Sequence, residues 1–172
     1  MIESKKILDA CCGSRMFWFD KEHPEALFCD NRKAEFVAMD RGKARKININ
    51  PDMVCDYKNL PFDDESFRLV VFDPPHLVRA GDKSYMQMKY GKLPCDWRAD
   101  LKAGFDECMR VLACDGVLIF KWSEVHIKTN ELIRVVEQQP LIGHISGKAA
   151  NTHWLTFMKI AETDGWSLEE ES

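Results

Sequence analysis

Short apolar runs alternate with polar, turn-forming segments along this chain. Each run is five to nine residues long and rich in branched and aromatic side chains, which is typical of buried strands. The predicted strands are residues 5–12, 26–30, 52–56, 67–73, 116–122, 141–147 and 152–160. The last two lie close enough in sequence to form a hairpin, which would add an antiparallel strand.

Two of the intervening segments carry apolar residues at intervals of three and four. Residues 98–112 and 129–138 therefore predict amphipathic helices, the second with Thr129 or Asn130 as its N-cap. Strands alternating with helices predict an α/β fold with a mostly parallel, seven-stranded sheet covered by helices on both faces.

Two connections depart from this alternation. Residues 14–25 are short and aromatic, so any helix there is stunted. Residues 34–50 fit a small hairpin about Arg41-Gly42 better than a helix.

Length and composition favour an ordinary globular domain over residues 1–172. Hydrophobic residues make up 45% and charged residues 30% of the chain. No apolar run approaches the ~20 residues that span a membrane. The apolar run after the N-terminal lysines is too short for a signal peptide, so we expect a cytoplasmic protein.

The seven cysteines show no C-x-x-C pair, and several lie beside apolar runs. Reduced thiols are therefore favoured over disulfides or a zinc site, and we expect no metal.

Charge is unevenly distributed. The net charge is −4, but two segments are basic. Residues 31–50 hold six basic and two acidic residues, and residues 77–98 hold five basic and two acidic residues. For the first segment, a solvated loop is as good an interpretation as a binding surface. Residues 161–172 hold five acids and no base, which predicts a flexible acidic tail.

Four predicted strands end in or beside an acid, at Asp9, Asp30, Asp56 and Asp73. Ligands of open α/β sheets bind beyond the carboxyl ends of the strands. Gly13, after the first strand, allows a tight turn and close approach to a ligand. Asp30 is suitably spaced to accept both hydroxyls of a ribose.

The stretches "ILDACCGS" and "VVFDPPHL" together resemble class I S-adenosylmethionine-dependent methyltransferases that modify exocyclic amino groups of DNA or RNA. "DACCGS" is similar to their D-P-F-C-G-S-G cofactor loop, and "DPPH" to their (D/N/S)-P-P-(Y/F/W/H) motif. The resemblance spans roughly residues 5–160 and implies a Rossmann-like fold. Cys11 and Arg15 stand where many members of the family have other residues.

The resemblance also implies a set of site residues. Asp30 would hold the ribose of S-adenosylmethionine and Asp56 would lie near its adenine. The residues lining its methionine part would be Asp9, Ala10, Cys11, Cys12, Gly13 and Ser14. The catalytic residues would be Asp73, Pro74, Pro75 and His76.

The tetrapeptide suits amine methylation. Asp73 and the Pro74 carbonyl could accept hydrogen bonds from the amine, and the prolines fix the backbone that presents them. His76 offers a flat face on which a base could stack. Taken alone, Asp-Pro-Pro-His could instead be a turn that ends a strand.

Residues 77–97 follow the tetrapeptide and mix basic with aromatic side chains, which favours a mobile substrate-facing loop. We expect substrate contacts from Arg79, Lys83, Tyr85, Lys89 and Tyr90. The sequence favours adenine N6, or cytosine N4, of DNA as the acceptor. Alternative acceptors are RNA, a small molecule and a protein amide. A non-catalytic role as a partner subunit also remains open. Target recognition could require a homodimer or a partner chain.

Overall fold

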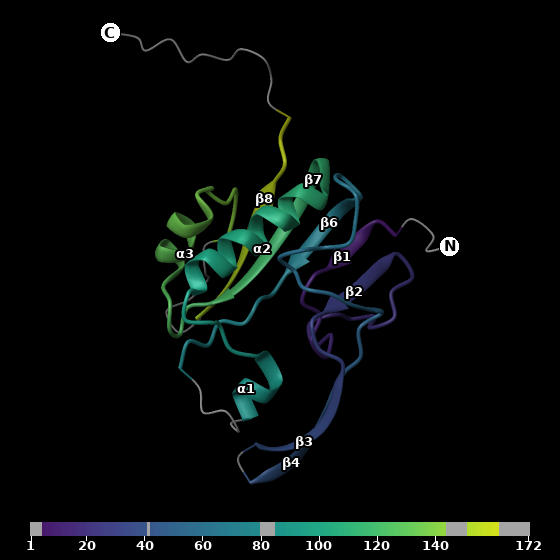
Figure 1. Cartoon of the computed structure of the whole chain (residues 1–172), viewed down its shortest axis with the longest axis vertical. Coiled ribbons are helices and arrows are strands. Elements are labelled where there is room, and N and C mark those ends of the chain that lie inside the picture. Colours follow the sequence, from purple (N-terminus) through teal and green to yellow (C-terminus); the bar gives the residue numbers. More distant parts are fainter. Residues whose placement is uncertain (1–4, 41, 80–84, 144–150, 162–172) are drawn as a thin grey trace.

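The structure, a computed structural model, describes residues 5–40, 42–79, 85–143 and 151–161. It confirms an α/β fold built on a mainly parallel sheet in the order β5-β2-β1-β6-β7-β8, in which only β8 is antiparallel (Figure 1). The strands are β1 (Ile7–Asp9), β2 (Ala26–Asp30), β5 (Met53–Val54), β6 (Phe67–Phe72), β7 (Leu112–Ser123) and β8 (Thr152–Met158).

The sheet has six strands among the described residues, where the sequence predicted seven. The missing strand is residues 141–147, most of which lie outside the described part of the chain. Within that segment, Ile142 makes an isolated antiparallel bridge to Thr156 of β8.

Both predicted helices are present, as α2 (Trp97–Val111) and α3 (Thr129–Val136). The N-cap of α3 is Lys128, with no capping hydrogen bond from its side chain, so the predicted cap at Thr129 or Asn130 is wrong. Thr129 lies one position inside the helix. Its backbone N–H and its hydroxyl instead donate to the Glu124 carboxylate, at 3.3 and 3.1 Å.

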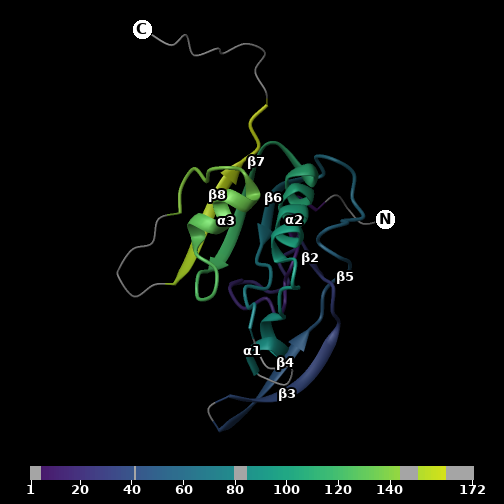
Figure 2. The same ribbon diagram turned by 60° about the vertical axis from the view of Figure 1, so that its left-hand side comes forward.

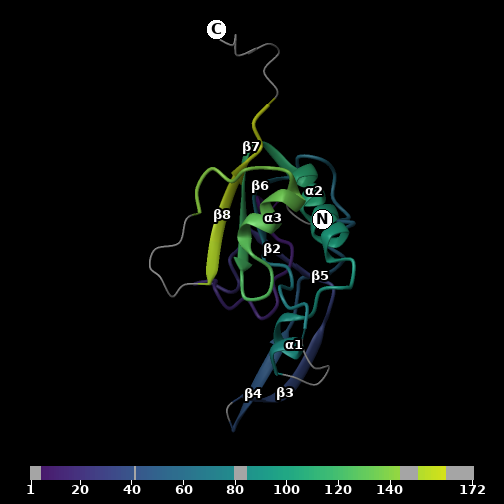
Figure 3. The ribbon, with the colours of Figure 1, turned by 90° about the vertical axis from the view of Figure 1, so that its left-hand side faces the viewer.

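Helices α2 and α3 lie on the same face of the sheet, so the prediction of helices on both faces is wrong for the described residues (Figure 3). The β1–β2 connection crosses the second face, as the right-handed rule for parallel strands requires. Neither it nor the β2–β5 connection forms a helix. The second face has its own small cluster, in which Trp18 packs against Phe28.

The β2–β5 connection forms a two-stranded hairpin of β3 (Ala34–Asp40) and β4 (Lys43–Ile49), as the sequence predicted. We call this hairpin the arm. It extends past the carboxyl ends of the sheet, and the short helix α1 (Tyr85–Tyr90) lies against it (Figure 2). The two share a hydrophobic cluster separate from the main core, which includes Ile47 and Tyr85.

The predicted substrate-facing loop, residues 77–97, thus contains a helix, while its residues 80–84 lie outside the described part. The predicted acidic tail lies outside it too, except for Ala161. No helix in the described ranges is long and apolar enough to cross a bilayer.

Candidate active site

The two sequence motifs lie side by side because β1 and β6 are neighbours. Leu8 pairs with Val70 and Asp9 with Val71, and the Ala10 N–H donates to the Val71 carbonyl at 2.9 Å. From this pair the chain order runs outward in both directions, to β2 and β5 on one side and to β7 on the other. Such a switch point leaves a crevice at the carboxyl ends of the strands.

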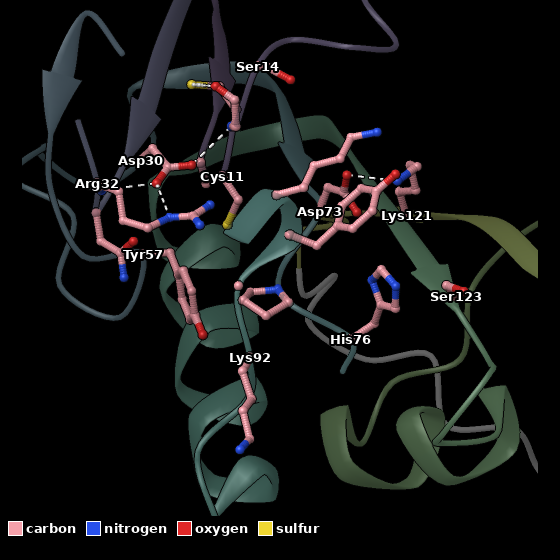
Figure 4. A pocket seen from close by; sticks show the side chains of 18 of the residues that line it. Cys11, Ser14, Asp30, Arg32, Tyr57, Asp73, His76, Lys92, Lys121 and Ser123 are labelled. Atoms are coloured by element: carbon pink, nitrogen blue, oxygen red, sulfur yellow. Dashed lines mark hydrogen bonds and ion pairs between the residues drawn. The ribbon is translucent and has the colours of Figure 1, made fainter. Parts of the chain in front are cut away.

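A cavity of about 720 Å³ opens at this crevice (Figure 4). Its volume lies within the range of roughly 300–1,000 Å³ that is usual for small-molecule sites. All the cavity walls come from strand ends, from α1 and α2, and from the loops between them. The residues that line it include Cys11, Gly13, Phe17, Asp30, Arg32, Asp56, Tyr57, Lys58, Asp73, Pro75, His76, Lys89, Tyr90, Gly91, Asp100 and Lys121.

The loop after β1 is held by the carboxylate of Asp9. This carboxylate accepts hydrogen bonds from the Cys11 N–H at 3.2 Å and from the Trp18 indole at 2.7 Å. Asp9 is fully buried, and burial raises its pKa to about 7, although the hydrogen bonds from Cys11 and Trp18 act to lower it. Unlike the five residues that follow it, Asp9 is not among the described lining residues. Asp9 therefore positions the loop from behind the cavity wall, and its predicted contact with a cofactor stays a prediction.

Asp30 ties the ends of β1 and β2 together inside the cavity. Its carboxylate accepts the Gly13 N–H at 3.0 Å on one oxygen, and the backbone N–H of Arg32 at 2.9 Å on the other. Gly13 has φ of +50°, a conformation that glycine adopts without strain. Asp56, the third predicted acid, also lines the cavity and accepts the Lys58 N–H at 2.9 Å.

Asp73 is paired with a lysine that sequence reasoning missed. The ammonium of Lys121, near the end of β7, lies 2.7 Å from Asp73 Oδ2 and above the rings of Phe17 and Trp154. Burial raises the pKa of Asp73 above its ordinary value, while the charge of Lys121 opposes that rise. The lysine therefore favours the ionised carboxylate.

His76 forms a flat wall beside Asp73. Its ring centre lies 5.5 Å from that of Tyr90, and both rings line the cavity. Burial, together with the charges of Lys121 and His126, lowers the pKa of His76 to about 4, so its imidazole is neutral at pH 7. Pro75 packs on Gly91, where an added Cβ would lie 3.1 Å from Pro75 Cγ.

A polar group at the other end of the cavity was also missed. The Tyr57 hydroxyl donates to the Asp100 carboxylate, and Lys58 donates to the other oxygen of that carboxylate at 2.7 Å. Asp100 lies in the first turn of α2, where an acid is common on any helix. Its position in the sequence therefore gave no sign of a role at the cavity.

The predicted substrate residues divide into three groups. Lys89 and Tyr90 line the cavity. Tyr85 packs against the arm instead, and Arg79 is exposed outside the described lining. Lys83 lies outside the described residues. Of the two prolines, Pro74 is buried and Pro75 lines the cavity.

Comparison with known proteins supports the fold alone. No protein-family model matches this chain. No curated protein matches it either. Among solved structures, the PH0226 protein from Pyrococcus horikoshii OT3 is similar over 93% of this chain and 84% of its own, with a TM-score of 0.53 and 17% identity.

Proposed function

We propose that this protein is an S-adenosylmethionine-dependent methyltransferase acting on an exocyclic amino group of a DNA base, either adenine N6 or cytosine N4. The observation that carries the proposal is the position of Asp73. Its carboxylate lies in the same cavity as the glycine loop after β1, on the strand next to β1. Among the described residues its hydrogen-bond donor is Lys121, on Oδ2, which leaves Oδ1 for a substrate amine.

The cavity residues fit a nucleoside-type methyl donor. The loop after β1 exposes backbone to the cavity next to Asp30, whose buried carboxylate is held in one orientation by Gly13 and Arg32. Asp56 and Tyr57 continue the same wall toward α2. S-adenosylmethionine, when bound, supplies an electrophilic methyl group on a sulfonium.

Asp73 would then act on the acceptor. An exocyclic amine is a weak nucleophile because its lone pair is delocalised into the ring. By accepting one amine N–H, the Asp73 carboxylate helps to localise that lone pair on nitrogen. The prolines fix the acceptor before the substrate arrives, so little reorganisation is needed during transfer.

We expect Asp30→Ala to weaken S-adenosylmethionine binding roughly 10- to 150-fold, because a hydrogen bond to a charged group contributes about 1.5–3 kcal/mol. Isothermal titration calorimetry measures the change directly. Asp20→Ala, which removes an exposed acid outside the described lining, is the control. An unchanged affinity of the Asp30 variant for S-adenosylmethionine would show that Asp30 does not contact the donor.

We expect His76→Phe to retain most of the activity and His76→Ala to lose it roughly 5- to 150-fold, since stacking on a base is worth about 1–3 kcal/mol. The imidazole is neutral, so a phenyl ring can replace its flat face. The measurement is kcat/KM on an oligonucleotide. Equal losses in the two variants would contradict a stacking role.

The proposal as a whole is tested with labelled donor. The protein is incubated with methyl-labelled S-adenosylmethionine and separate pools of DNA, RNA and protein, and the labelled product is digested to identify the modified base. Label on adenine N6 or cytosine N4 of DNA is the expected result. Label on RNA or protein only, or no transfer despite donor binding, would refute the proposed acceptor.

A further inference from the structure

The arm is basic although the protein as a whole is acidic. Residues 34–49, which span it, carry four basic and two acidic residues, a local charge of +2. Because the whole chain has a net charge of −4, the other residues together carry −6. The hairpin that carries this positive charge projects from the sheet (Figures 1 and 2).

The arm begins at the cavity. Asp30, Asn31 and Arg32 line the cavity and lead directly into β3. The Arg32 guanidinium donates to the Met88 carbonyl of α1 at 3.4 Å, and α1 packs on the arm through their shared cluster. A polymer with one residue in the cavity can therefore extend along the arm.

The outer face of the arm presents charged and apolar side chains to solvent. Val37 and Met39 are 64% and 63% exposed on its outer face. Lys46 also faces outward, and its pair with Glu35 is exposed on both sides. Lys43, beside the turn, is exposed as well. Exposed ion pairs contribute little to stability. These lysines can therefore bind phosphates with only a small loss of free energy.

We propose that the arm binds the duplex DNA flanking the target base, lying as a two-stranded ribbon in the major groove. The inference rests on the proposed function and names the form of its substrate. The arm has seven paired positions, a length of about 20 Å at ~3.4 Å per residue. The major groove of B-DNA, about 12 Å wide, admits such a ribbon, whereas that of A-form RNA is too narrow.

The test compares two double variants with the same loss of charge. Lys43→Ala/Lys46→Ala changes the arm. Lys6→Ala/Arg68→Ala changes exposed cations at the amino ends of β1 and β6, the opposite edge of the sheet, and like the first it removes one partner of an exposed ion pair. Fluorescence anisotropy with duplex DNA, the matching single strand and duplex RNA is measured over a series of salt concentrations.

We expect the arm variant to bind duplex DNA about tenfold more weakly, with the slope of log K against log salt reduced by about two, and the control variant to bind as the wild type does. Unchanged duplex affinity, or an equal loss in the control, would overturn the inference. An equal loss on the single strand or on duplex RNA would also overturn it, because the groove contact would then not be specific.

Failure of the inference and failure of the proposed function remain distinguishable. Methyl transfer to the single-stranded oligonucleotide is measured in parallel, and we expect the arm variant to retain it. Methyl transfer by the protein, together with duplex binding that does not depend on the arm, would refute the inference about the arm and leave the proposed function intact. Arm-dependent duplex binding without any transfer would refute the methyltransferase assignment and leave the arm as a DNA-binding element.

Discussion

Replacing Asp73 with alanine should reduce methyl transfer at least about 100-fold while the donor still binds. The loss follows because alanine offers no acceptor for the amine N–H, and losing such a preorganised group typically costs two to three orders of magnitude. Single-turnover transfer to an oligonucleotide measures the chemical step. Calorimetry with S-adenosylmethionine measures donor binding on the same preparation.

The Asp73 variant also loses the ionic partner of Lys121, so its fold must be verified. The Lys121 side chain is 19% exposed, and an unpaired cation at such a position lowers stability. The double variant Asp73→Ala/Lys121→Met removes both charges and serves as the control for stability. Turnover within a few-fold of wild type in either variant would contradict the proposed role of Asp73.

Replacing Lys121 with methionine should move the acidic limb of the pH–rate profile to higher pH. Burial raises the pKa of Asp73, and at present the charge of Lys121 opposes this rise. Without that charge the pKa rises further, so a larger share of Asp73 is protonated near neutrality and cannot accept the amine N–H. Activity falls roughly tenfold for each unit by which the pKa exceeds the assay pH, and recovers as the pH is raised.

The conservative variant separates this role from a purely structural one. Lys121→Arg keeps a positive charge beside Asp73 and should retain an acidic limb close to that of wild type. A uniform loss of activity in Lys121→Met at every pH, with the acidic limb in place, would show that the lysine only supports packing against Phe17 and Trp154.

The sequence predicted the neighbours of the site because they lie in local motifs. Gly13 and Asp73 each follow an apolar run, and parallel pairing brings such positions to one edge. Lys121 could not be found in this way. It is 48 residues from Asp73 and lies inside an alternating strand, where a lysine usually faces solvent. Only the pairing of β6 with β7 brings the two together.

The error about the faces of the sheet has a different origin. Residues 14–25 and 34–50 have poor helical patterns, whereas a parallel sheet usually carries helices on both faces. The structure follows the local signals: one segment is an aromatic loop that packs Trp18 on Phe28, and the other is the arm. The first covers the second face without a helix, and the second projects beyond the edge of the sheet.

The separate cluster shared by the arm and α1 has a consequence for how such a protein can diversify. Ile47 and Tyr85 pack with each other's elements and not with the core that holds β1 and β6. Substitutions within this pair of elements can therefore compensate one another without disturbing the strands that present Gly13 and Asp73. Evolution could therefore change the arm together with the side of α1 that packs on it, altering the outer surface while Tyr90 keeps its place beside His76.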